Sequence, residues 1–126
     1  MKFSEIVYTR PDMPAVFSQL DRLTAQLKAA SSAQEQLRLY KEMEELTDHF
    51  STQASVCGIR NTVDTRDAFY EEEQAFLDQQ YPLLSEKTQA FHQALLQSPF
   101  RAQLEQALGS LLFVNIEMEL RSFSPE

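Results

Sequence analysis

Apolar side chains recur along most of this chain at intervals of three or four residues, the spacing that places them on one face of an α-helix. Asp12 can cap a first helix, and Pro14 costs little in a first helical turn, where its missing N–H would be unpaired anyway. The pattern therefore predicts a helix that begins after Asp12 and ends at residues 29–32. Its apolar stripe consists of Val16, Leu20, Leu23 and Leu27.

A second, longer stripe predicts a helix of more than five turns. Ser32 and Glu35 have the spacing of a capping box, in which each side chain accepts a hydrogen bond from the backbone N–H of the other residue. Gly58 and the pair 61–62 weaken helical structure, so we expect this helix to end between Cys57 and Asn61. The stripe behind the capping box contains Leu39, Met43, Leu46, Phe50, Ala54 and Cys57.

The third predicted helix begins at a cap, Asp64, and runs to Gln97. Asp67 and the run 71–73 place acidic side chains near the positive end of its dipole, and we interpret that run as a solvated face. Pro82 interrupts the backbone hydrogen bonding, but the apolar pattern keeps its phase across it, so we predict a kink and no break. The apolar positions form two columns, Phe69, Phe76 and Leu83 beside Tyr70, Leu77, Leu84 and Phe91.

Two shorter segments complete the chain. Ser98 and Pro99 predict a helix start, and Gly109 predicts its end, with Phe100, Leu104 and Leu108 as its stripe. Residues 114–121 alternate as a half-buried strand would, but a lone strand would have no partner and Leu112, Ile116 and Leu120 also have helical spacing, so we predict helix. Residues 124–126 resemble the start of a further helix. The expected fold is an all-α, antiparallel multi-helix bundle, a single domain over residues 1–126 with one long helix kinked at Pro82.

The composition argues against two classes of partner, nucleic acids and membranes. The 126 residues are enough for one hydrophobic core, and 11 basic against 19 acidic residues give a net charge of −8. Such a charge repels phosphate backbones and anionic headgroups, so neither nucleic acid nor a membrane is an expected partner. The single cysteine cannot form an internal disulfide, and no signal peptide or membrane span is visible, so we expect a cytoplasmic protein.

The residues themselves offer no catalytic or metal site. Glu45 and His49 lie one helical turn apart, but no further ligand accompanies them, and a hydrogen-bonded surface pair is the simpler interpretation. His92 reads as a histidine at the edge of the core. Cys57 lies on an apolar stripe and is too far along the helix from His49 to be activated by it, so we interpret it as a small buried apolar residue. We assign no catalytic residue and no metal ligand.

Residues 59–70, Ile-Arg-Asn-Thr-Val-Asp-Thr-Arg-Asp-Ala-Phe-Tyr, resemble the N-terminal lobe of oligoendopeptidase F and of Pz-peptidase-type zinc metallopeptidases, relatives of the thimet oligopeptidases. The segments 8–11, 94–96, 98–101 and 122–126 agree with the same family in order and spacing. Asn61 departs from it, because the family pattern leads us to expect histidine there. The resemblance spans the whole chain but only about the first fifth of the family's usual length.

The resemblance implies a cytoplasmic zinc endopeptidase that hydrolyses short peptides. In that family the zinc ligands come from an H-E-x-x-H motif and a downstream glutamate, none of which is present in this sequence. The cofactor would therefore belong to the parent protein, and we expect the 126-residue chain alone to be inactive. Its implied role is to form part of the wall of the substrate channel, with the catalytic lobe of the same protein as its partner.

Arg60, Asp64, Arg66 and Asp67 are our candidates for a structural polar cluster that fixes the turn between the second and third helices, although each surface ion pair contributes only about 0–1 kcal/mol. Two alternatives belong to other classes. The chain could act as a stand-alone helical interaction module, or it could be an inactive truncated remnant. We expect the isolated chain to self-associate through apolar surface that the catalytic lobe would cover.

Overall fold

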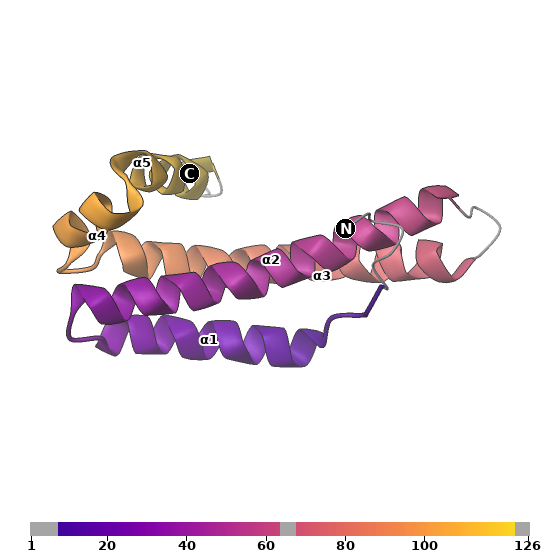
Figure 1. The fold of residues 1–126 in the computed structure, drawn as a ribbon, viewed down its shortest axis with the longest axis horizontal. Helices are drawn as coiled ribbons and strands as arrows, with labels where there is room; N and C mark the ends of the chain where they lie inside the picture. Colours follow the sequence, from indigo (N-terminus) through magenta and orange to yellow (C-terminus); the bar gives the residue numbers. More distant parts are fainter. Residues whose placement is uncertain (1–7, 64–67, 123–126) are drawn as a thin grey trace.

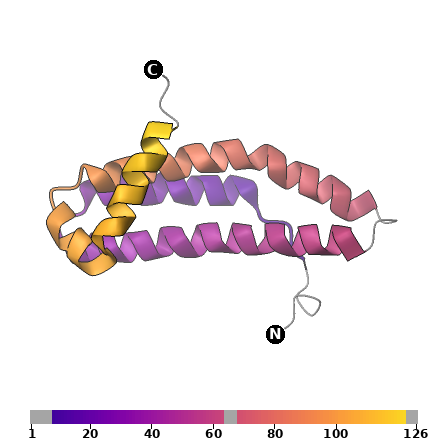
Figure 2. The same ribbon diagram turned by 90° about the horizontal axis from the view of Figure 1, so that it is seen from above.

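Five α-helices make up the part of the chain that the computed structural model describes, residues 8–63 and 68–122, and no strand occurs in these two ranges. The helices are α1 (Met13–Ala29), α2 (Ala33–Val63), α3 (Ala68–Leu96), α4 (Arg101–Leu108) and α5 (Ser110–Ser122). Figures 1 and 2 show α1, α2 and α3 side by side, each antiparallel to the one before, with α4 and α5 at one end. None of the described helices combines the length and the apolar character needed to cross a membrane.

The predicted apolar stripes form a common core. Every member of the α1 stripe is buried, and on α2 the side chains of Leu39 and Cys57 have no exposed surface. Phe91 of α3 and Phe113 of α5 are likewise fully enclosed, and Leu104 joins them from α4. All five helices therefore contribute to one hydrophobic cluster, and the predicted all-α antiparallel bundle is confirmed.

The predicted helix starts of α1 and α2 are confirmed by their capping hydrogen bonds. The Oδ1 atom of Asp12 accepts a bond from the N–H of Ala15 at 3.3 Å. At α2, Ser32 Oγ accepts from the N–H of Glu35 at 3.2 Å. The returning bond differs from a strict capping box, because the Glu35 carboxylate accepts from the N–H of Ser31 and not from that of Ser32.

The predicted end of α2 is wrong, because the helix continues past Gly58 to Val63. A glycine inside a helix costs about 1 kcal/mol relative to alanine, so something must offset it. Thr62 Oγ1 donates to the carbonyl of Gly58 at 2.9 Å, and Asn61 Nδ2 donates to Gln74 Oε1 of α3 at 3.1 Å. The packing of α3 against this segment therefore extends α2 beyond its local signals.

The helix α3 continues through Pro82, as predicted, and Figure 2 shows it bowed along its length. Of its two apolar columns, only the one that ends at Phe91 is buried in the core over most of its length. Phe69 and Leu83, from the other column, are 50% and 41% exposed. The buried face of α3 is therefore narrower than the two apolar columns in the sequence suggest.

The last two helices differ from prediction at one boundary. The sequence predicts a helix start at Ser98 and Pro99, but these residues lie in a turn and α4 begins at Arg101. Ser98 Oγ accepts a hydrogen bond from the N–H of Phe100, and this bond stabilises the turn. Gly109 ends α4 as predicted, with φ of 95°, a conformation that other residues adopt only under strain. The segment that follows is helical, as predicted, and its strand alternative is wrong.

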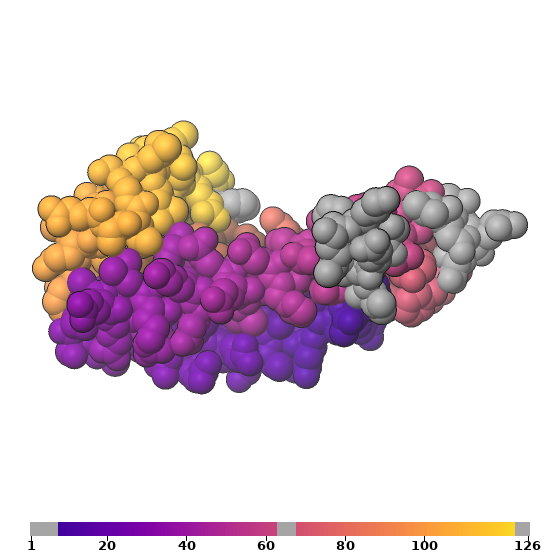
Figure 3. Space-filling view, in the orientation of Figure 1, coloured from indigo at the N-terminus to yellow at the C-terminus, as the bar shows by residue number. Residues whose placement is uncertain are grey.

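A buried polar contact fixes the α4–α5 pair to the bundle. Ser98 Oγ donates to Gln36 Oε1, and Gln36 Nε2 donates to the carbonyl of Leu27 at 3.0 Å. Both polar side chains are buried, so each needs these partners. The end of α1, the start of α2 and the α3–α4 turn are thereby held at one point, from which the C-terminal helices project in the space-filling view (Figure 3).

Candidate functional site

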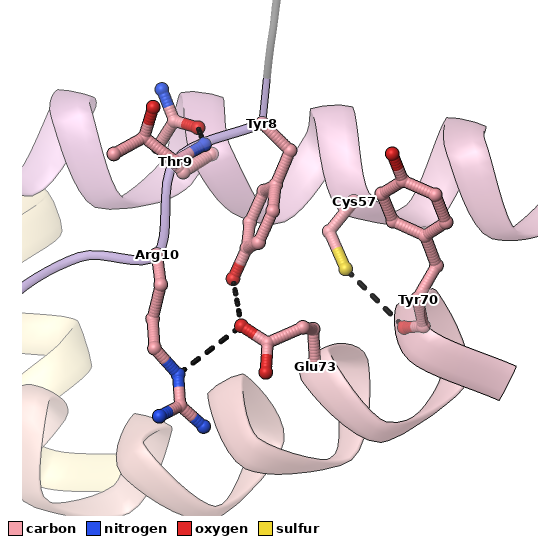
Figure 4. A network of polar contacts seen from close by, with 7 residues as sticks. Tyr8, Thr9, Arg10, Cys57, Tyr70 and Glu73 are labelled. Atoms are coloured by element: carbon pink, nitrogen blue, oxygen red, sulfur yellow. Dashed lines mark hydrogen bonds and ion pairs between the residues drawn. The ribbon is translucent and has the colours of Figure 1, made fainter.

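A network of polar contacts lies where residues 8–10 cross α2 and α3 (Figure 4). Its centre is Glu73 of α3, which is only 8% exposed. Tyr8 Oη donates to Glu73 Oε1 at 2.9 Å, and Arg10 Nε lies 3.1 Å from the same oxygen. A buried carboxylate is stable only when it is hydrogen-bonded and charge-paired, and these two side chains supply both conditions.

Further contacts hold the N-terminal segment in register. The N–H of Thr9 donates to the buried Oε1 of Gln53 on α2 at 2.8 Å. The Arg10 guanidinium lies 3.6 Å from the centre of the Phe76 ring, within cation–π range. Tyr8 also packs edge-on against the rings of Phe69 and Tyr70 on α3. Residues 8–10 therefore act as a strap that ties α2 to α3.

The network keeps its acidic hydroxyl and thiol groups neutral. Burial, followed by the Glu73 carboxylate, raises the pKa of Tyr8 far above its ordinary value of 10.0. Burial also raises the pKa of the Cys57 thiol, with Glu73 and Asp78 adding to the effect. Cys57 has no exposed surface, and its Sγ donates to the carbonyl of Tyr70 at 3.4 Å. Its predicted burial is confirmed, and a neutral enclosed thiol cannot act as a nucleophile.

The polar cluster predicted at the α2–α3 turn is only partly visible. Asp64, Arg66 and Asp67 lie outside the described residues, so the cluster itself stays a prediction. Arg60 lies in the last turn of α2 and is partly buried. The nearby position at which the family pattern suggests histidine holds Asn61, which joins α2 to α3 through Gln74.

The central residue of the network, Glu73, was interpreted from the sequence as part of a solvated acidic run, and that interpretation is wrong for this position. A signal for its burial exists, because Glu73 falls at helical spacing between Tyr70 and Leu77, in the apolar column that is buried. The sequence could not supply its partners, since Tyr8 lies 65 positions away.

The sequence pair with metal-ligand spacing lies on the surface. Glu45 and His49 are both exposed on α2. Across the described ranges, no group of three or more His, Cys, Asp or Glu side chains is placed to hold a metal ion. His92, interpreted as a residue at the edge of the core, is mostly buried, and its Nδ1 lies 3.3 Å from Glu119 Oε2 of α5.

The environment of His92 makes the stability of the fold dependent on pH. Burial lowers the pKa of His92 below its ordinary value of 6.5, and the carboxylates of Glu119 on α5 and Glu44 on α2 only partly oppose this effect. The unfolded chain therefore binds this proton more tightly than the folded chain does. It follows that protonation of His92 reduces the free energy of unfolding as the pH falls below about 6.5.

We predict that His92→Gln reduces this loss of stability on acidification. Urea unfolding of both proteins at pH 7.5, 6 and 5 measures the effect, with His49→Gln on the exposed face of α2 as the matched control. The control should keep the pH slope of the unchanged chain. An equal slope in the His92 variant would show that its titration is not linked to folding.

Nearly the entire chain, residues 3–123, matches the sequence profile of the Peptidase M3 N-terminal domain. The chain belongs to this family. Its fold agrees with two solved structures, each at a TM-score of 0.92. One is a Pz peptidase A with an inhibitor, 40% identical over 98% of this chain, and the other is described as an oligoendopeptidase F, 39% identical over 99% of it. Among curated protein sequences, none matches the chain.

The M3 N-terminal domain seen here spans only 22% of the length of each solved relative. The contacts described above all join one helix to another. They are the strap with its partner Glu73, and the Asn61–Gln74 hydrogen bond. In this M3 domain, the network around Glu73 therefore stabilises the arrangement of α2 and α3.

Proposed function

We propose that this chain is the N-terminal lobe of a zinc metallo-oligoendopeptidase and forms part of the wall of its substrate channel, with short peptides as substrates. The observation that carries the proposal is the family match over residues 3–123, together with its 40% identity to a Pz peptidase A. Because the chain corresponds to 22% of that relative, the remaining part of such a protein would carry the catalytic residues. The single buried cysteine supports a cytoplasmic location.

The residues that the structure describes do not fit a zinc site. A catalytic zinc needs three protein ligands that converge on one point. The two histidines lie on different helices, His49 exposed on α2 and His92 against Glu119 of α5. The zinc of the proposed peptidase would therefore be held by residues beyond this lobe, and we derive no catalytic step from it.

The lobe would contribute rigidity and an apolar docking face. A channel wall that admits only unstructured peptides has to resist deformation, and the strap and the common core of the five helices provide this resistance. On α5, Phe113 and Ile116 face the core while Leu111, Val114 and Met118 are exposed. A helix that is apolar on both faces is typical of one buried between two bodies. This surface supports the catalytic lobe of the same protein as the partner.

A chimera tests the proposal. We expect no hydrolysis of a quenched fluorescent peptide by the 126-residue chain, with zinc or with chelator. We expect chelator-sensitive hydrolysis when the chain replaces the matching 22% of the Pz peptidase A relative, and little hydrolysis when that part is deleted without replacement. Chelator-sensitive cleavage by the pure chain would place zinc chemistry within it. A well-folded chimera without activity would contradict the proposed role and favour a separate interaction module.

A further inference from the structure

A cavity of about 300 Å³ lies between α2, α3 and α5, away from the Glu73 network. It is found where α5 rises from the three-helix bundle, a step visible in Figure 3. Phe50 and Leu84 form part of its apolar floor, and Leu112 of α5 forms another side. This volume is at the lower end of the range for small-ligand sites, so it suits one side chain or a similar small group.

The cavity has an aromatic wall at its mouth. Tyr81 of α3 lines it and is 62% exposed, an unusual degree for a large aromatic side chain. Tyr40 of α2 lines it from the buried side. Burial, with the Glu44 carboxylate adding to it, raises the pKa of Tyr40 to about 12, so the ring carries a neutral hydroxyl. Neutral aromatic rings attract cations through their faces.

The charges around the cavity have one sign. Glu44 enters the lining from α2 and Glu119 enters it from α5, and the lining given by the described residues contains no lysine or arginine. His92 also lines the cavity, and burial lowers its pKa, so it is neutral at pH 7.5. Its Nδ1 lies 3.3 Å from Glu119 Oε2 but makes no well-aligned hydrogen bond there. Neither carboxylate charge is therefore balanced by a cationic group in the cavity lining.

We propose that this cavity binds the positively charged group of a peptide, an ammonium or a guanidinium. The aromatic walls would receive its apolar stem and the two glutamates would accept its N–H donors. A phosphate or carboxylate would meet two like charges, and a neutral apolar group would leave both carboxylate charges without a cation. The proposal relies on the proposed peptidase role only for the source of the cation. It concerns binding, and it requires no peptide cleavage by the lobe.

Chemical-shift titration of the ¹⁵N-labelled chain at pH 7.5 tests the proposal. The probes are N-acetyl-lysine amide and N-acetyl-arginine amide for a side-chain cation, alanine amide for an α-ammonium, and N-acetyl-norleucine amide as the neutral analogue of lysine. We expect at least one cationic probe to shift the amides around Tyr81, Glu44 and Glu119, and the neutral analogue to leave them unshifted. The probe that binds most tightly identifies the source of the charge.

Two variants and a control decide the outcome. Glu44→Gln, at an exposed position, and Glu119→Gln should each weaken binding of the cationic probe by roughly tenfold, the loss expected for one charge-assisted hydrogen bond. Glu86→Gln removes the same charge from an exposed position on α3 outside the cavity and should leave the Kd unchanged. Equal binding of the norleucine probe, unchanged Kd in both cavity variants, or no binding of any cation would overturn the proposal. None of these results bears on peptide hydrolysis by the chimera, so the two proposals fail separately.

Discussion

Phe113→Ala should destabilise the fold by about 3–5 kcal/mol, the range for removing a buried phenylalanine ring. Phe113 is the largest fully buried side chain of α5, and its ring lies against α4, with the Arg101 guanidinium 5.4 Å from its centre. The ring therefore anchors α5 to the remainder of the bundle. Its removal would leave a cavity that the neighbouring helices fill only in part.

Urea unfolding and native-state hydrogen exchange measure this effect, with Leu111→Ala as the matched control. Leu111 lies on the same helix but is 71% exposed, so its truncation should change the free energy of unfolding by no more than about 0.5 kcal/mol. In the Phe113 variant, amides of α5 should exchange faster than those of α1, because α5 loses its main anchor. Equal stabilities of the two variants would show that α5 contributes little to the folded state.

The sequence alone predicts correctly those helices whose cap and apolar stripe are formed by neighbouring residues. The first helix follows from a cap at Asp12 and a stripe with regular spacing, and both were found in the structure. Its apolar face is continuous, so any packing partner buries the same side chains. The resemblance carried by residues 59–70 also led to the correct family, which the apolar pattern alone could not identify.

The predictions from the sequence were wrong where contacts between residues far apart in the chain determine the structure. The end of α2 depends on the contact between Asn61 and Gln74, which no local helix signal contains. His92 and Glu119 meet because α5 folds back over α3, and the cavity beside them exists only after this packing. Local signals predict where a helix can form, whereas contacts between helices determine where it ends and which polar side chains meet.

Glu73→Ala is expected to destabilise the fold by about 1–3 kcal/mol, because it removes a buried carboxylate and leaves the partly buried hydroxyl of Tyr8 without its acceptor. The contribution of Arg10 is smaller, since that side chain is half exposed and its charge is screened by solvent. Glu72→Ala provides the control, because Glu72 is the exposed neighbour in the same helical turn. Its effect should stay within about 0.5 kcal/mol.

The destabilisation caused by Glu73→Ala should be greatest near the strap, because the Glu73 carboxylate holds residues 8–10 over α2 and α3. Tyr8 lies beside Cys57 in Figure 4, and both contact the same part of α3. Loosening of the strap should therefore expose the thiol, and Cys57 should react faster with a thiol reagent in Glu73→Ala than in Glu72→Ala under native conditions. If the fold is destabilised but Cys57 is not labelled faster, the proposed role of the strap would be contradicted, because Glu73 would then stabilise α3 alone. A double-mutant cycle with Tyr8→Phe isolates the Tyr8–Glu73 hydrogen bond from the remaining contacts of Glu73.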